Sequence, residues 1–185
     1  MEINIFETVY GILFHPVETF RNAFSDKPYK FPLSVVLFSA LFLTMLGNDA
    51  FGVGFLGVFF SKAVGLIVYW LFYAFFIDLM ARMFNIKGRY SKLLTLMSFS
   101  FIPWMFLAPL KLLKGFSEWT SVIAVLLLLG VWLWTIALQM LAVSETYEIP
   151  RKNAIIILLI PYLGTILYFI WVFDFFIKLS QIAGL

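Results

Sequence analysis

Cysteine is absent from this sequence of 185 residues, and charged residues make up only 12% of it. The absence of cysteine excludes disulfides, thiolate metal sites and cysteine nucleophiles, and it gives no indication of the redox compartment. The charged share is about half of that in ordinary soluble domains. Hydrophobic residues reach 63%, more than a soluble protein of this size is able to bury. The composition therefore predicts an integral membrane protein.

Five apolar segments account for most of the chain. Each crossing of a hydrocarbon core about 30 Å thick needs roughly 20 apolar residues. We expect an all-α membrane bundle of five transmembrane helices that fills residues 31–185. The fourth segment contains no charged residue and is the clearest of the five. The spans are predicted at about 31–47, 55–84, 93–113, 119–143 and 154–180.

Residues 1–30 are predicted to form an amphipathic segment before the first span. Apolar residues recur there at alternating spacings of four and three, which places one apolar stripe along a helix. These residues are Phe6, Tyr10, Leu13, Val17, Phe20 and Phe24. Such a helix fits a position at the membrane interface or docking on a partner. Pro16 has no amide hydrogen to continue a helix, so we expect a break near His15.

Lysine and arginine are distributed unevenly among the loops. Nine of the thirteen lie before the first span or near the loops after the second and fourth spans. The other four lie toward the opposite side. Cytoplasmic loops carry the excess of basic residues in membrane proteins. The distribution therefore predicts a cytoplasmic N-terminus and an external C-terminus.

Three stretches of the sequence resemble one family of polytopic membrane proteins. Residues 88–94 (GRYSKLL), followed by 101–103 (FIP), resemble the centre of the Yip (Yip-one domain) family. Residues 15–20 (HPVETF) are similar to the helix before the first span of its prokaryotic members. Residues 138–143 (LQMLAV), with 152–154 (KNA), resemble the junction between its fourth and fifth spans. The resemblance implies a five-helix membrane domain with a cytoplasmic N-terminus.

The eukaryotic members of this family are associated with Rab-type GTPases and with vesicle traffic between internal membranes. This sequence lacks their long N-terminal region and their Asp-Leu-Tyr-Gly-Pro signature. The resemblance therefore implies a short member in a prokaryotic cytoplasmic membrane, and a Rab-type GTPase partner is not expected.

Two aspartates inside the predicted spans are candidates for function, because charges in membrane helices are often functional. Asp78 and Asp174 would suggest a protease dyad or a proton relay if they met. They are predicted near opposite faces of the membrane, whereas carboxylates that share a proton must nearly touch. Arg82 and Lys178 follow them at a spacing of four, which pairs opposite charges on one helix face. We expect two local ion pairs, with a transport or catalytic role as the alternative.

The sequence contains no pattern typical of an enzyme. His15 is the only histidine, and no second ligand follows it at the spacing of a metal site. The glycines at 52, 54 and 57 lack the lysine and hydroxyl residue of a phosphate-binding loop. We expect no catalytic residue, no cofactor and no metal.

Basic residues from two loops are predicted to converge on one membrane face. They are Lys87, Arg89, Lys92, Arg151 and Lys152. Basic residues near an anionic membrane surface gain about 1 kcal/mol each, so these five are candidate contacts for lipid headgroups. The alternative is that they only set the orientation of the chain. Loops this short offer no recognition element for nucleic acid, which is not an expected partner.

The third and fifth spans are interrupted by Pro103, Pro109, Pro161 and Gly164. Interrupted membrane helices free backbone carbonyls, which neighbouring helices, water or a ligand must satisfy. These residues are candidates for kinks or for a cavity, with Gln139 of the fourth span as a polar partner.

Three functional hypotheses follow. The leading one is a non-enzymatic membrane protein that organises lipids or recruits protein partners, a second copy of the chain included. The alternative is a small transporter or lipid-translocating protein with a cavity at the broken spans. An intramembrane enzyme is a third hypothesis.

Overall fold

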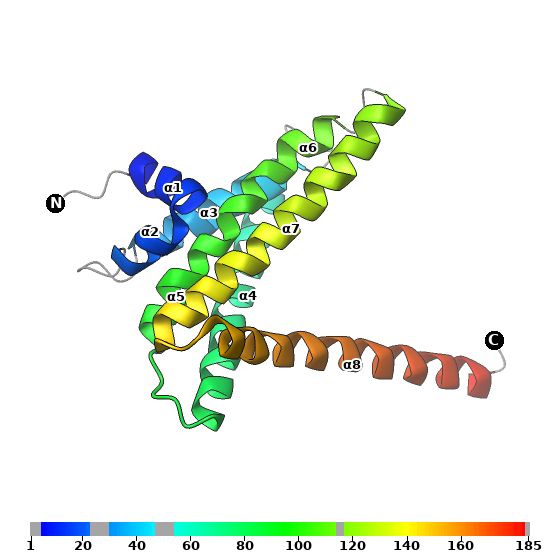
Figure 1. The fold of residues 1–185 in the computed structure, drawn as a ribbon. Coiled ribbons are helices and arrows are strands. Elements are labelled where there is room, and N and C mark those ends of the chain that lie inside the picture. Colours follow the sequence, from blue (N-terminus) through cyan, green and yellow to red (C-terminus); the bar gives the residue numbers. More distant parts are fainter. Residues whose placement is uncertain (1–4, 23–29, 47–53, 114–116, 184–185) are drawn as a thin grey trace.

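The computed structural model is helical throughout the described part of the chain, and no strand occurs there (Figure 1). The structure describes residues 5–22, 30–46, 54–113 and 117–183. The predicted stripe position Phe24 and the glycine at 52 lie outside these ranges. The all-α prediction is confirmed. The elements are α1 (Ile5–Phe14), α2 (Pro16–Asn22), α3 (Lys30–Met45), α4 (Phe55–Met83), α5 (Tyr90–Ser98), the 3₁₀ helix η1 (Phe99–Phe106), α6 (Leu107–Leu113), α7 (Glu118–Tyr147) and α8 (Arg151–Ala183).

Four helical runs are long and apolar enough to cross a membrane. They are α4, the run α5–η1–α6, α7, and α8 from Arg151 to Phe175. Helix α3 has 16 residues, a rise of about 24 Å, which is short of a hydrocarbon core about 30 Å thick. The described chain therefore has four helices of spanning length. The first predicted span, over 31–47, is therefore not shown to cross the membrane.

Alanine occupies many of the places where these helices meet. Small residues let membrane helices approach closely, because packing rather than the hydrophobic effect holds helices together in lipid. Six alanines are completely buried: Ala40, Ala74, Ala81, Ala124, Ala142 and Ala154. They lie on α3, α4, α7 and α8, so close backbone approach is a general feature of the bundle.

The third predicted span changes helix type where its first proline occurs. Pro103 lies inside η1, whose eight residues exceed the usual 3₁₀ run of about three or four. A proline nitrogen has no hydrogen to donate, so the regular α-helical pattern fails there. The hydroxyl of Ser39 on α3 is 3.1 Å from the carbonyl oxygen of Phe101. A neighbouring helix thus provides a polar contact to the irregular backbone.

The N-terminal helices break where the sequence predicts, with α1 ending at Phe14 and α2 beginning at Pro16. Phe20 of α2 is fully buried, and its ring centroid lies 5.5 Å from that of Phe99 in η1. The apolar stripe predicted along residues 6–24 does not match the buried faces of α1 and α2. Tyr10 is 59% exposed, whereas Ile12, outside the stripe, is fully buried. The break at Pro16 separates the two helices, so one residue spacing does not continue across it.

Helix α8 leaves the bundle soon after it begins (Figure 1). Ala154, Ile157 and Leu158 near its start are buried, and the helix packs there against α7 and α4. Farther along, Leu167 and Trp171 are 64% and 63% exposed. Helices α7 and α8 therefore diverge from the turn that joins them, and the outer part of α8 extends away from the bundle (Figure 1).

Candidate functional site

Asp78, near the end of α4, is a buried carboxylate with hydrogen-bond partners from three parts of the chain. Arg82 Nε lies 2.8 Å from Asp78 Oδ2. The Tyr147 hydroxyl, at the end of α7, donates to Asp78 Oδ1 at 2.7 Å, and the backbone amide of Arg89 donates to the same oxygen at 3.1 Å. A buried charge is tolerated only with such partners. We call Asp78, Arg82, Arg89 and Tyr147 the Asp78 cluster.

The loop between α4 and α5 is shaped to fit this cluster. Asn85 has φ of 59°, in the left-handed region that asparagine tolerates better than most residues, and so reverses the chain after α4. Gly88 packs closely against the guanidinium of Arg82. A Cβ at this position would lie only 2.6 Å from Arg82 Nε, so a larger residue would displace the arginine side chain. The loop thereby brings the Arg89 amide to Asp78.

Two further contacts join this loop and α5 to the end of α7. The Arg89 guanidinium forms an ion pair with Glu148. Lys92 Nζ donates to the Glu145 carbonyl oxygen at 2.7 Å. The hydrogen bond from Arg89 and its positive charge hold the pKa of the Glu148 carboxyl below its ordinary value. Glu148 has φ of 56°, a conformation that L-residues rarely adopt, so these contacts also hold a strained turn.

The five basic candidates from the sequence fall into two groups. Arg89 and Lys92 are engaged by Glu148 and by Glu145 as described. The other three are exposed, and the described chain gives them no acidic partner. The Arg89–Glu148 pair holds the loop that carries Lys87 close to the turn before α8, whose first two residues are Arg151 and Lys152. We call these three, Lys87, Arg151 and Lys152, the basic end.

Each predicted aspartate lies close to its basic partner, but in contrasting surroundings. The Asp78–Arg82 pair belongs to the buried cluster. Lys178 Nζ lies 2.6 Å from Asp174 Oδ2 on the outer part of α8, where both side chains are more than half exposed. Asp174 is not among the hydrogen-bond partners of Asp78. The structure brings together the members of each pair and not the two aspartates.

A second polar contact joins α4, α7 and α8 through Gln139. Its side chain is 3% exposed, and its Oε1 accepts a hydrogen bond of 2.8 Å from the Tyr162 hydroxyl. The Tyr73 hydroxyl lies 3.4 Å from the same oxygen. Sequence reasoning identified Gln139 but neither tyrosine, because nothing in their spacing relates residues on three separate helices.

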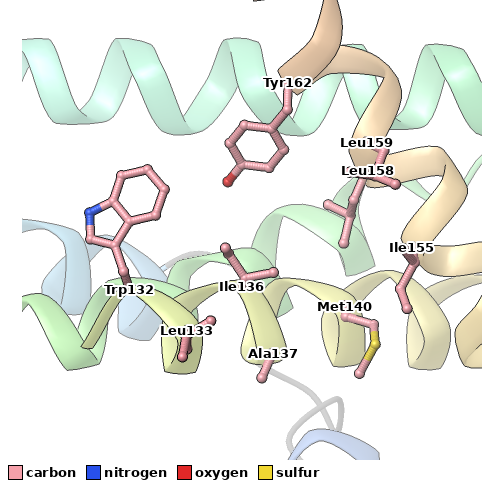
Figure 2. A pocket seen from close by; sticks show the side chains of 9 residues that line it. All are labelled: Trp132, Leu133, Ile136, Ala137, Met140, Ile155, Leu158, Leu159 and Tyr162. Carbon is pink, nitrogen blue, oxygen red and sulfur yellow. The ribbon is translucent and has the colours of Figure 1, made fainter. Parts of the chain in front are cut away.

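Close to this contact, a groove of about 410 Å³ lies between α7 and α8 (Figure 2). Helix α7 contributes five lining residues and α8 contributes four. The lining residues are Trp132, Leu133, Ile136, Ala137, Met140, Ile155, Leu158, Leu159 and Tyr162. The groove is almost wholly apolar and starts near the turn between the two helices.

The four helix-breaking residues of the cavity prediction do not line this groove. Pro103 is buried in η1, which packs against α3 and α7. Pro109 and Gly164 are exposed, and Pro161 is half-buried. The groove lies between α7 and α8, which correspond to the fourth and fifth predicted spans. Helix α8 packs mainly against α7 and α4 rather than against the third predicted span. A transport cavity at the third and fifth spans stays a prediction.

A sequence model described as the Yip1 domain matches residues 10–173 of the chain. No curated protein and no solved structure matches the chain. The matched range contains the Asp78 cluster, the basic end and the α7–α8 groove, so all three belong to the matched domain.

Proposed function

The chain belongs to the Yip1 domain family, and from that premise we propose that it is a non-enzymatic membrane protein that gathers anionic lipids at its basic end. Its helices and its family make it an integral membrane protein. The observation that carries the proposal is the set of three exposed cations at one end of the bundle without acidic partners in the described chain. At about 1 kcal/mol each, they favour anionic headgroups by roughly a hundredfold.

The Asp78 cluster supports this proposal as a framework. Lys87 lies in the loop whose Arg89 amide bonds to Asp78, and Arg151 follows the turn held by the Arg89–Glu148 pair. Ordered backbone keeps basic side chains at a fixed place, which reduces the ordering cost of binding. The same end is also available to a protein partner, and recovery of such a partner is the other outcome that the proposal accommodates.

We also propose the finer topology. Residues 1–30 lie at the cytoplasmic interface, α3 completes the first of five crossings, and the C-terminus is external in a prokaryotic cytoplasmic membrane. Support comes from the basic residues, since Lys87, Arg151 and Lys152 all lie at one end of the bundle.

The lack of cysteine permits a direct test of this topology, because single cysteines report their side without background labelling. A membrane-impermeant maleimide on intact cells is expected to label Lys62→Cys at one end of α4 and not Lys87→Cys beyond the other. Glu18→Cys distinguishes five crossings from four. It stays unlabelled, as Lys87→Cys does, if α3 crosses the membrane. Labelling of Glu18→Cys in intact cells contradicts a crossing by α3.

The lipid proposal is tested by extracting the chain in native lipid discs and measuring the anionic share of the captured lipid. The wild-type discs are expected to exceed the host membrane in anionic lipid, and the triple variant K87Q/R151Q/K152Q to match it. Lys62→Gln is the matched control, since it removes an exposed cation at the other end of α4. Wild-type discs with the host lipid composition and no captured protein contradict the proposal.

A further inference from the structure

The walls of the α7–α8 groove suit a hydrocarbon chain. The volume of about 410 Å³ lies within the range of roughly 300–1,000 Å³ that small-molecule sites occupy. The lining residues of α7 run from Trp132 to Met140 and those of α8 from Ile155 to Tyr162. Figure 2 shows Trp132 and Ile136 of α7 on the side of that helix that faces Tyr162 of α8. The Tyr162 hydroxyl already donates to Gln139. The Trp132 indole nitrogen is then the one remaining side-chain donor among the lining residues, so a polar occupant would gain little there.

Two basic residues, Arg151 and Lys152, lie at the end of α8 where this apolar groove begins. The α8 lining residues follow Arg151 at spacings of four, seven, eight and eleven, which places them on its face of the helix. Lys152 lies beside Arg151, one turn before Ile155. Both basic side chains are exposed in the first turn of α8. The arrangement is an apolar groove with two cations at one end.

The lining residues of α8, from Ile155 to Tyr162, span a rise of about 10 Å. With Arg151 included, the rise is about 16 Å, close to the half-thickness of a hydrocarbon core, about 15 Å. A single extended acyl chain is long and thin enough to lie along this groove between the two helices.

We propose that the groove binds one acyl chain of an anionic phospholipid whose phosphate is held by Arg151 and Lys152. The inference rests on the proposed function, and it adds a defined place on the protein and a chemical class of ligand. Lys87, on the other loop, attracts anionic lipid without being part of this site.

The test uses phosphatidylglycerol and phosphatidylcholine that carry a diazirine in one acyl chain. The full-length chain is reconstituted in vesicles of equal parts of the two lipids, with the probe present in one lipid at a time. After irradiation, mass spectrometry identifies the crosslinked peptides. Phosphatidylglycerol is expected to label residues 132–140 and 155–162 more than phosphatidylcholine does. Glycerol phosphate, which has the charge but no acyl chain, is expected not to compete.

Two variants separate the acyl chain from the headgroup. Ala137→Trp fills the groove and is expected to abolish labelling there, while Leu126→Trp, at an exposed α7 position outside the groove, leaves it unchanged. Arg151→Gln is expected to retain labelling and to lower the preference for phosphatidylglycerol by about fivefold, the loss that one basic residue near an anionic surface implies. Equal helix content and elution volume of the two tryptophan variants control for folding.

The outcomes distinguish this site from the broader proposal. Enrichment of anionic lipid in native discs that Ala137→Trp leaves at the wild-type level, and that K87Q/R151Q/K152Q removes, overturns the groove site and leaves the proposed function standing. Absence of enrichment in the wild type, with no captured protein, removes the proposed function itself. Groove labelling without preference between the two lipids, or competition by glycerol phosphate, overturns the site.

Discussion

Removal of the Tyr147 hydroxyl tests whether the Asp78 cluster holds the end of the bundle together. Tyr147→Phe keeps the ring, which is buried, and deletes the 2.7 Å hydrogen bond to Asp78 Oδ1. Hydrogen bonds to charged groups contribute about 1.5–3 kcal/mol. Asp78 keeps its bonds from Arg82 Nε and the Arg89 amide in this variant, so we expect the lower end of the range. A loss of about 1.5–2 kcal/mol raises the unfolded population roughly 10–30-fold.

The assay is reversible unfolding in mixed micelles followed by circular dichroism, with wild type, Tyr147→Phe, Asp78→Asn and the double variant as a thermodynamic cycle. A coupling energy of about 1 kcal/mol or more between the two sites is expected for a direct contact. Tyr10→Phe is the matched control, because the Tyr10 side chain is 59% exposed and its ring survives the change. A stability loss for Tyr147→Phe no greater than for Tyr10→Phe, or additive effects in the cycle, would refute the role given to the cluster.

Three other changes, at contacts described above, use the same unfolding assay. Gly88→Ala places a methyl group 2.6 Å from Arg82 Nε, so the arginine side chain must shift and its hydrogen bond to Asp78 weakens; we expect a cost of about 1 kcal/mol. Gly130→Ala, with open space around it, is expected to stabilise by about 0.5–1 kcal/mol, and equal effects of the two changes contradict the packing argument. The Glu148 pKa is lowered in the folded state, so the stability it provides is present above the ordinary glutamate pKa and is lost as pH falls through the lower folded value. The difference between wild type and Glu148→Gln should therefore vanish in acid, and a difference that persists there contradicts the assignment. Ser39→Ala removes the hydroxyl near the Phe101 carbonyl and is expected to cost about 0.6 kcal/mol, the average for such bonds between membrane helices, and no loss would mean that the helix tolerates the irregular backbone alone.

The end of α7 shows where sequence reasoning reached its limit. Residues 144–147 are polar, and the fourth span was predicted to end at 143 for that reason. The helix continues to Tyr147, because Thr146 and Tyr147 are buried against neighbouring helices and the Tyr147 hydroxyl meets Asp78. Polarity indicates exposure only when no tertiary partner exists, and a partner 69 residues away leaves no trace in local spacing.

The site was predictable to the extent that its chemistry is local. The spacing of four between Asp78 and Arg82 is a property of one helix, and it identified the pair. The distribution of lysine and arginine gathered the basic residues into one set, but it was unable to separate Arg89, which has an acidic partner, from Arg151, which has none in the described chain. The α7–α8 groove was not predictable, because it arises from the angle at which two helices part.

That angle also determines how much bilayer the protein occupies. Helix α8 is held near its start by Leu158 and by the Tyr162–Gln139 hydrogen bond. From Tyr162 to Ala183 it extends about 30 Å, so a rotation of about 10° around Tyr162 displaces its far end by about 5 Å. The few contacts near this pivot therefore set the lateral footprint of the molecule and the crowding of lipids around it.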